Sequence, residues 1–361
     1  MQKLKRIVVK VGTRLLTSDN NQLDKQKVKA IVSQICAVRK KGIEALLVSS
    51  GAIGAGMGIL GIKKRPRSVH ELQAVAAIGQ NQLIGLYSEL FKDRGIIAAQ
   101  MLLTQDDFDN RKRYLNIKST IQELLRREAI PVINENDSVA TDEIRCGDND
   151  RLSSLVADLS ESDMLVLLTD VDGLLDESGR PISSVDEVTP RMERLVKAKK
   201  CGISLGGMGT KLEAARQSMD AGIKCVIANG NTPDCIIRVI EKGDIGTVCM
   251  PAKKLIAKKR WIAFSTKTKG AISVDDGAMD VLTAKNRSLL ASGVIGVRGR
   301  FAAKEVISVT DRHSKEFARG ITNYSSDELS RVKGMKSSQI KSVIEGRNQY
   351  EVIHKDNLVI L

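Results

Sequence analysis

The sequence predicts an α/β protein with an open, mainly parallel sheet and helices on both faces, followed by a small β-rich domain. Short apolar runs recur along the first two thirds of the chain, and segments with helical spacing lie between them. The runs end in polar clusters, as strands do at the ligand-binding edge of open α/β sheets. After residue 251 the apolar runs become shorter and are broken by Gly or Asp. The first part of the chain is therefore predicted to be an enzyme.

Five apolar runs are predicted to be buried strands: residues 7–11, 46–48, 131–133, 165–168 and 225–228. Between the first two, apolar residues from Val28 to Val38 repeat at helical spacing, with Asp24 as the candidate N-cap and Gly42 just after them. Strand and helix alternate in this way from residue 5 to about residue 250. This alternation implies right-handed crossovers and a parallel sheet.

The predicted organisation is a catalytic domain at residues 1–251, a lysine-rich linker at 252–260, a β-rich domain at 261–345 and a C-terminal segment at 346–361. Trp261 is expected to anchor the second domain. Its strands are predicted at residues 272–274, 294–297, 306–309 and 317–321, and a helix at 276–285.

Composition excludes several classes of protein. With 361 residues and 42% hydrophobic content, two domains are the better expectation. No apolar stretch reaches the roughly 18 residues of a membrane span, and no signal peptide precedes the first strand, so a cytoplasmic protein without membrane contact is expected. The six cysteines show no CxxC spacing and only three histidines accompany them, which favours buried reduced thiols over a metal site.

The net charge of +14 is unevenly spread and suggests anionic partners. Residues 260–361 hold 17 basic and 11 acidic side chains, a net charge of +6 over the shorter part of the chain. Nucleic-acid binding and simple solubility both explain such an excess, and solubility is the preferred interpretation.

Two segments carry the candidate chemistry. Residues 202–211 are glycine-rich and lead into a helix, so their backbone N–H groups could bind phosphate beside the charge of Lys211, although a plain helix-entry turn has the same pattern. Amides and carboxylates are dense at residues 134–138 and 147–151, and residues 49–52 form a similar polar end. Either cluster alone would suit a solvated turn. Together they favour a substrate with amino or hydroxyl groups.

Seven motifs in order resemble the amino acid kinase family: KVGT at residues 10–13, VSSGAIGAG at 48–56, QMLLT at 100–104, VINEND at 132–137, GDNDRLS at 147–153, LTDVDG at 168–173 and GGMGTK at 206–211. Several of these motifs are shared with sister kinases, whereas residues 133–137 with 147–150 resemble the branch that phosphorylates glutamate. Residues 261–345 resemble the PUA domain that bacterial members of this branch often carry. The resemblance covers nearly the whole chain.

The resemblance implies the amino acid kinase fold and ATP-dependent phosphorylation of the side-chain carboxylate of L-glutamate to L-glutamyl 5-phosphate, the first step of proline biosynthesis. Mg²⁺ is expected with ATP, bridging its phosphates, without a dedicated metal site on the protein. A carboxylate with a pKa of about 4.3 is already ionised at pH 7, so no general base is needed and His70 is expected to be non-catalytic. The resemblance further implies feedback inhibition by proline, RNA contact by the PUA-like domain and a homo-oligomer, either dimer or tetramer.

By the same resemblance, the catalytic residues are Lys10, Lys211 and Asp170, where the two lysines neutralise the transferring phosphoryl group and Asp170 orients them. The expected ATP-binding residues are these three with Gly12, Thr13, Thr169, Leu205, Gly206, Gly207, Met208, Gly209 and Thr210. Glutamate is expected to contact Ser50, Gly51, Ala52, Asn134, Asp137, Asp148, Asn149 and Asp150.

Some positions depart from the family pattern and leave alternatives open. Arg14 and Leu205 replace the usual hydroxyl residues, and the loop at 174–181 is shortened, which bears on nucleotide affinity rather than on the reaction. A sister kinase with another acid substrate, an RNA-binding protein and a module that senses an amino acid without phosphorylating it remain rival interpretations.

Overall fold

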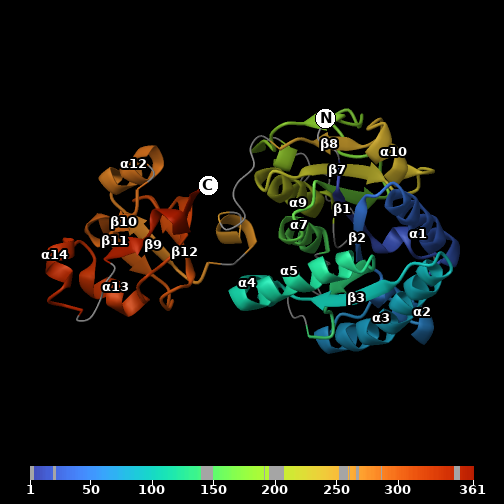
Figure 1. Cartoon of the computed structure of the whole chain (residues 1–361), viewed down its shortest axis with the longest axis horizontal. Coiled ribbons are helices and arrows are strands. Elements are labelled where there is room, and N and C mark those ends of the chain that lie inside the picture. The colour runs from blue at the N-terminus through green and yellow to red at the C-terminus, as the bar shows by residue number, and fades with distance from the viewer. Residues whose placement is uncertain are drawn as a thin grey trace. The chain divides into compact units, whose positions relative to one another are not determined.

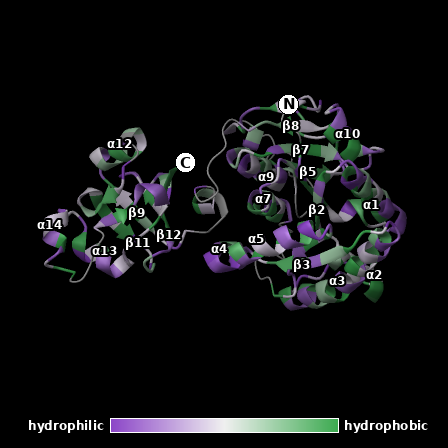
Figure 2. Cartoon of the chain, viewed as in Figure 1, coloured by the Kyte–Doolittle hydropathy of each residue, from purple (hydrophilic) through white to green (hydrophobic). Residues whose placement is uncertain are grey.

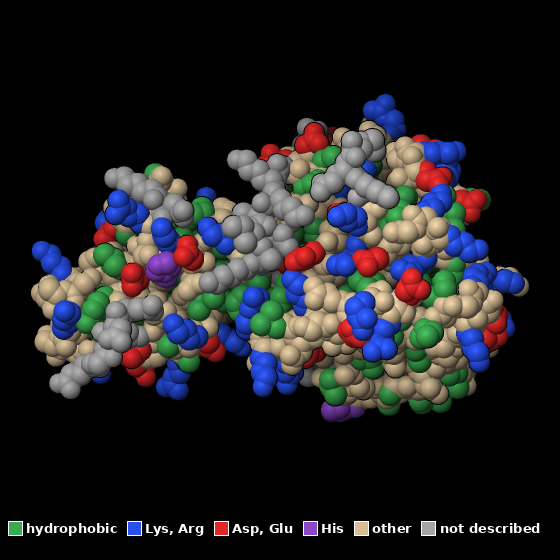
Figure 3. All heavy atoms as spheres, in the orientation of Figure 1, with side chains coloured by type: hydrophobic (Ala, Val, Ile, Leu, Met, Phe, Trp, Pro, Cys, Tyr) green, Lys and Arg blue, Asp and Glu red, His purple; other side chains and the backbone are tan. Residues whose placement is uncertain are grey.

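The computed structural model describes residues 4–18, 22–139, 149–190, 192–194, 207–251, 259, 261–265, 268–285, 287–344 and 350–361. The chain forms two compact units, Met1–Lys254 and Leu255–Leu361 (Figure 1). Among the described helices, none is long and apolar enough to cross a membrane. On the face that Figure 3 shows, Lys and Arg side chains are interspersed with acidic ones over both units.

The first unit is built on an eight-stranded sheet with the order β3-β4-β2-β1-β5-β7-β8-β6. Its strands are β1 (Arg6–Val11), β2 (Glu44–Ser49), β3 (Ala98–Leu103), β4 (Ile130–Glu135), β5 (Met164–Thr169), β6 (Ser184–Val185), β7 (Lys224–Asn229) and β8 (Thr247–Cys249). All neighbours pair in parallel except β7 and β8. The five predicted runs are the five central strands, which confirms the predicted mainly parallel sheet.

Helices cover both faces of this sheet. They are η1 (Thr13–Leu15), α1 (Lys25–Lys40), α2 (Ala52–Leu60), α3 (Val69–Lys92), α4 (Gln105–Asp109), α5 (Arg111–Arg126), α7 (Asn149–Leu159), α9 (Met208–Asp220) and α10 (Cys235–Glu241). One core joins α1, α3 and α10 to alternate strand residues such as Val9 and Val11. Lys10 points to the opposite face, where α7 and α9 lie. In Figure 2 the strands are largely hydrophobic, whereas the helices carry both hydrophobic and hydrophilic residues.

Local sequence explains where these helices begin. The side chain of Asp24 accepts hydrogen bonds from the backbone N–H groups of Gln26 and Lys27, which confirms the predicted cap of α1. Helix α2 begins after Gly51, whose φ of 115° lies in the left-handed region that glycine tolerates. The sharp turn at Gly51 lets Ser50, at the carboxyl end of β2, remain at the edge of the sheet.

Helices α2 and α3 pack at backbone contact along a pair of glycines. A Cβ atom at Gly79 would lie 1.9 Å from the carbonyl oxygen of Ala52, and one at Gly56 would lie 1.9 Å from that of Val75. Real Cβ atoms do not approach so closely, so only hydrogen fits at either position. We call this contact the glycine seam.

The second unit has a five-stranded sheet with the order β11-β9-β12-β13-β15 and a two-stranded sheet of β10 and β14. The strands are β9 (Ala271–Val274), β10 (Leu289–Leu290), β11 (Val294–Arg298), β12 (Val306–Thr310), β13 (Glu316–Ile321), β14 (Glu351–Ile353) and β15 (Leu358–Ile360). The predicted helix is α12 (Asp276–Lys285), and α13 (Ser326–Val332) and α14 (Ser337–Ile340) follow. Trp261 is buried, at the start of a short helical turn.

The end of the chain differs from the predicted organisation. Residues 346–361 were expected to form a separate segment, but β14 pairs with β10 and β15 pairs with β13. Val352, Ile353 and Leu358 lie in the core of the second unit. Two three-residue strands give too short an alternating pattern to be detected in the sequence. The predicted linker lies almost entirely outside the described residues.

Candidate active site

Two buried lysines share one buried carboxylate on the Lys10 face of the sheet. Lys10 Nζ lies 2.6 Å from Asp150 Oδ1, and Lys211 Nζ lies 3.1 Å from Asp150 Oδ2. Thr210 Oγ1 also donates to Asp150 Oδ2, at 2.7 Å. Lys10 is 4% exposed, Lys211 6% and Asp150 0%. We call Lys10, Asp150 and Lys211 the lysine cluster; it carries one net positive charge.

Burial and charge act against each other in the lysine cluster. Burial alone would raise the pKa of Asp150, but the ammonium groups of Lys10 and Lys211 outweigh it and lower the pKa. Burial lowers the pKa of Lys211 more strongly than the carboxylate of Asp150 raises it. Asp150 lies in the first turn of α7, where the helix dipole also favours a negative charge.

Asp170, which is expected to orient the two lysines, is hydrogen-bonded to other residues in this structure. Its Oδ2 accepts a hydrogen bond from Arg14 Nη1 at 2.8 Å, and its Oδ1 accepts one from Thr169 Oγ1 at 3.2 Å. Partial burial would raise the pKa of Asp170, but the hydrogen bond from Arg14 outweighs it and lowers the pKa. The charge of Asp170 raises the pKa of Lys211. In this structure the carboxylate that contacts both lysines is that of Asp150.

The described part of the glycine-rich segment forms the start of α9. Gly207 is the N-cap residue, and no side chain caps the helix there. Met208, Gly209 and Thr210 make the first turn, and Lys211 follows. The uncapped N–H groups of this turn therefore lie beside the lysine cluster, as an anion-binding helix N-terminus requires. Leu205 and Gly206 lie outside the described residues.

Gly12 and Thr13 follow β1 directly and begin the 3₁₀ turn η1. A Cβ at Gly12 would lie 3.8 Å from Lys10 Nζ, so this turn passes beside the lysine cluster. The carbonyl oxygen of Thr13 accepts hydrogen bonds from the backbone N–H groups of Leu16 and Thr17. Arg14 is on the same turn and 67% of its side chain is exposed.

A second group of polar side chains, two buried and two half-buried, lies next to the lysine cluster. Asn149 Nδ2 donates to Ser50 Oγ at 2.8 Å and to Asn134 Oδ1 at 2.9 Å. The backbone N–H of Glu135 donates to Asn134 Oδ1 at 2.9 Å and to Asn149 Oδ1 at 3.3 Å. Asn134 Nδ2 donates to Gln80 Oε1 at 2.8 Å. We call Ser50, Gln80, Asn134 and Asn149 the amide cluster.

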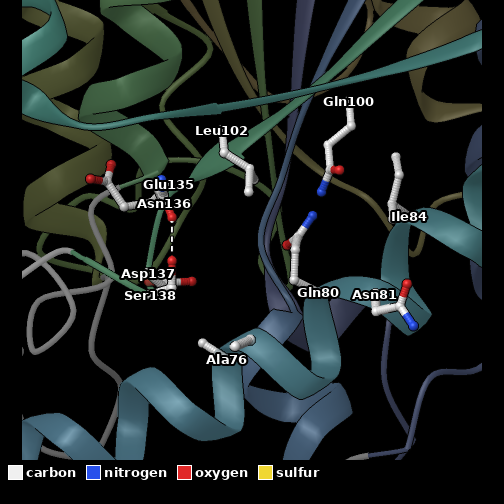
Figure 4. Close-up of a pocket in the computed structure, with 11 residues that line it drawn as sticks. Ala76, Gln80, Asn81, Ile84, Gln100, Leu102, Glu135, Asn136, Asp137 and Ser138 are labelled. Atoms are coloured by element: carbon white, nitrogen blue, oxygen red, sulfur yellow. Dashed lines mark hydrogen bonds between the residues drawn. The ribbon is translucent and has the colours of Figure 1, made fainter.

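Asp137 lies beyond β4 at the wall of a pocket of about 280 Å³. The pocket is lined by α3, β3 and the end of β4; its residues include Ala76, Gln80, Asn81, Gln100 and Leu102 (Figure 4). Burial raises the pKa of Asp137 to about 6, and the charge of Arg65 opposes this rise. A carboxylate held in this way gains from a cationic partner, which would restore the solvation that burial removes.

The structure thus brings together most of the residues expected at the site. Lys10, Asp150 and Lys211 meet, as do Ser50, Asn134 and Asn149, and the two clusters are joined because Asn149 and Asp150 are consecutive in α7. Gly51 and Ala52 lie beside Ser50 at the start of α2, and Asp148 lies outside the described residues. His70 is exposed near the start of α3.

Gln80 was missed by sequence reasoning. It sits in the middle of a helix, 54 residues from its partner Asn134, and no local pattern distinguishes it from other polar helix residues.

Among the described residues, no cluster of His, Cys, Asp or Glu could hold a metal ion. The described cysteines Cys36, Cys225, Cys235 and Cys249 are buried free thiols, as expected. Besides the carboxylates of Asp137, Asp150 and Asp170, the site presents cations, amides and a helix N-terminus, which are suited to carboxylate and phosphate oxygens.

Comparison with known proteins identifies both parts of the chain. Residues 5–229 match the model of the amino acid kinase family, and residues 270–344 match the PUA domain. The glutamate 5-kinase of Caldanaerobacter subterraneus subsp. tengcongensis is 44% identical, over 99% of this chain and 98% of that protein. The glutamate 5-kinases of Thermoanaerobacter sp. (strain X514) and Citrifermentans bemidjiense are each 42% identical, over at least 99% of this chain and 98% of theirs. The chain therefore belongs to the glutamate 5-kinases of the amino acid kinase family and carries a C-terminal PUA domain.

Proposed function

We propose that this protein transfers the terminal phosphoryl group of ATP to the side-chain carboxylate of L-glutamate, giving L-glutamyl 5-phosphate for proline biosynthesis. The observation that carries the proposal is the junction of the two clusters at Asn149 and Asp150. A group that can bind a carboxylate thereby adjoins a group that can neutralise a phosphoryl group.

In this mechanism the amide cluster orients the acceptor, while the lysine cluster stabilises the transition state. The glutamate carboxylate is ionised at neutral pH and attacks phosphorus directly, so no side chain needs to remove a proton. Lys10 and Lys211 approach the transferring group while Asp150 fixes both ammonium groups. The N–H groups at the start of α9 bind phosphate oxygens, with Gly12, Thr13 and Thr169 beside them.

Mg²⁺ would accompany ATP as its phosphate-bound counter-ion and would neutralise charge on the β- and γ-phosphates. Asp170 is the carboxylate of the described site that is open to solvent, which suits an outer contact to the hydrated ion. Asp150 is saturated by two lysines and a hydroxyl group, so it remains an orienting residue.

Asp137 is proposed to bind the α-ammonium group of glutamate. Its half-buried carboxylate, with a pKa raised to about 6, is ionised at pH 7 and gains most from a cation that enters the pocket. Proline also carries a cationic nitrogen and a carboxylate. It should therefore inhibit in competition with glutamate, and inhibition that glutamate cannot relieve would place the effector elsewhere.

The test is a coupled assay of ADP release with and without glutamate, with hydroxylamine present to trap the acyl phosphate as glutamyl hydroxamate. Turnover should require glutamate, and N-acetylglutamate should be a poor substrate because its nitrogen carries no charge. Equal turnover of the two acids would contradict the proposal. Lys10→Ala and Lys211→Ala should each lower kcat by roughly 100-fold or more, with a much smaller change in glutamate KM.

The remaining expectations are proposals of the same kind: a cytoplasmic location, a homo-oligomeric state and RNA contact by the PUA domain. RNA binding through phosphates should weaken steeply as salt rises, which a titration at low and physiological salt would measure.

A further inference from the structure

A continuous line of side-chain hydrogen bonds connects α3 to the end of β2. Gln80 Oε1 accepts from Asn134 Nδ2, and Asn134 Oδ1 accepts from Asn149 Nδ2. The second hydrogen of Asn149 Nδ2 is donated to Ser50 Oγ. The line therefore joins one side chain each from α3, β4 and α7 to Ser50, the residue directly after β2.

The line has a direction, because every amide has one donor end and one acceptor end. Asn134 Oδ1 already accepts from Asn149 and from the backbone N–H of Glu135. If the amide of Asn134 were reversed, its NH₂ group would face both of these donors. Asn134 and Asn149 are 2% and 6% exposed, so water could not relieve that conflict.

The direction of the line determines what Ser50 can do. Because Ser50 Oγ accepts a hydrogen bond from Asn149, its own hydrogen is left to donate. Within the described part of the chain, no acceptor is found for that hydrogen. Ser50 is therefore directed to act as a donor, which is the role needed to bind a carboxylate oxygen.

We propose that Gln80 is a positioning residue that, together with the backbone N–H of Glu135, holds this direction and so keeps Ser50 a hydrogen-bond donor to the carboxylate substrate. The inference rests on the proposed function. The side-chain oxygen of Gln80 accepts a hydrogen bond from Asn134 Nδ2 and so keeps that NH₂ group turned away from Asn149. This role does not require Gln80 to contact the substrate. Gln80 thereby favours a substrate with a carboxylate over one with an amide. The NH₂ group of a substrate amide would meet the Ser50 hydroxyl group, which is already directed to donate.

The fold holds Gln80 firmly enough for this role. The preceding residue, Gly79, is in backbone contact with Ala52, two residues after Ser50. One end of the line, Gln80, is thus in the tightly packed α2–α3 pair, and the other end, Ser50, lies two residues before α2. In Figure 4, Gln80 rises from α3 into the pocket, with its amide directed toward that of Gln100.

The test compares three variants of the full-length protein. Gln80→Met keeps the volume and removes the acceptor; it should raise glutamate KM about tenfold, with ATP KM and kcat changed less than about twofold. Gln80→Glu keeps an acceptor and should raise glutamate KM less than Gln80→Met does. Gln82→Met, the same substitution at an exposed residue of α3 that does not line the pocket, is the control and should leave glutamate KM near the wild-type value.

A double-mutant cycle separates positioning from a general effect on structure. Ser50→Ala removes the proposed donor, so adding Gln80→Met to it should raise glutamate KM by less than about twofold more. If the two effects multiply, or if Gln80→Met and Gln80→Glu act equally, the proposal is wrong. If the wild-type protein forms no glutamyl hydroxamate, the proposed function is wrong. If the wild type is active but Gln80→Met has an unchanged glutamate KM, only the inference about Gln80 is wrong.

Discussion

Replacing Asp150 by Asn would remove one negative charge from between two buried lysines while keeping the shape of the side chain. Lys10 and Lys211 would then face each other without the carboxylate that contacts both, at positions that are 4% and 6% exposed. Removing one partner from a buried ion pair costs about 3–5 kcal/mol, because the remaining charge is left uncompensated. The two ammonium groups should separate, or one should lose its proton.

The expected loss of activity is a separate quantity, because it comes from misplacing the two ammonium groups in the transition state. A loss of about 3 kcal/mol of transition-state stabilisation corresponds to roughly a 150-fold lower kcat. We therefore expect Asp150→Asn to lower kcat by about 100- to 1,000-fold, with a smaller change in glutamate KM. Thr210→Val removes only a hydroxyl donor to the same carboxylate. Its cost should be about 1 kcal/mol, so kcat should fall no more than about tenfold.

The pH dependence adds an independent measurement. Lys211 must be protonated to act, and its pKa is already lowered by burial while Asp150 opposes that effect. Without Asp150 the pKa falls further, so activity should disappear at a lower pH as the pH is raised. The lowered pKa of Asp150 also means that its contribution to stability is present at neutral pH and is lost as the pH falls below the usual range of a carboxyl group.

The assay is coupled ADP release from pH 6 to 10 for wild type, Asp150→Asn and Thr210→Val, with thermal unfolding of each protein. A kcat of Asp150→Asn within threefold of wild type, with an unshifted alkaline limb, would refute the role given to this carboxylate. So would equal losses in Asp150→Asn and Thr210→Val.

Three further predictions concern other parts of the molecule. Because burial raises the pKa of Asp137 to about 6, the wild-type KM for glutamate should rise as the pH falls through 6. Asp137→Asn should have a high glutamate KM at every pH. It should also have a higher melting temperature than wild type at pH 7, because the variant has no buried carboxyl group to ionise. Gly79→Ala should destabilise by about 1–3 kcal/mol in a denaturant titration, whereas Gly85→Ala, on the same helix with no atom within 4 Å of the added Cβ, should be neutral or stabilising. A chain ending at residue 257 should fold and phosphorylate glutamate; a folded but inactive truncation would show that the tail completes the site or a required oligomer.

The sequence predicts the centre of the sheet better than its edges. Strands β1, β2, β4, β5 and β7 are flanked by other strands and buried on both faces, so they appear as continuous apolar runs. β3 is only partly buried and β6 has two residues, so neither gives such a run. Edge strands need fewer apolar residues, and their sequence signal is correspondingly weak.

The candidate site is predictable in part for a related reason. Polar residues after buried strands must lie at one edge of a parallel sheet, which places Lys10 near Ser50, Asn134 and Thr169. Which carboxylate meets the lysines depends on where α7 begins and how it is rotated, and neither is encoded in a local pattern. Asp150 rather than Asp170 occupies that position because α7 packs across the face to which Lys10 points.

The glycine seam restricts how this enzyme could be redesigned. Because a methyl group at Gly56 in α2 or at Gly79 in α3 would collide with a carbonyl oxygen, the facing sides of the two helices tolerate no larger residue there. The pocket side of the same helix, at Ala77, Asn81 and Ile84, carries no such restriction. A variant library designed to accept a new acid should change those three positions and keep Gly56 and Gly79. The substituted side chains would then line the pocket while the distance between α3 and Ser50 stays constant.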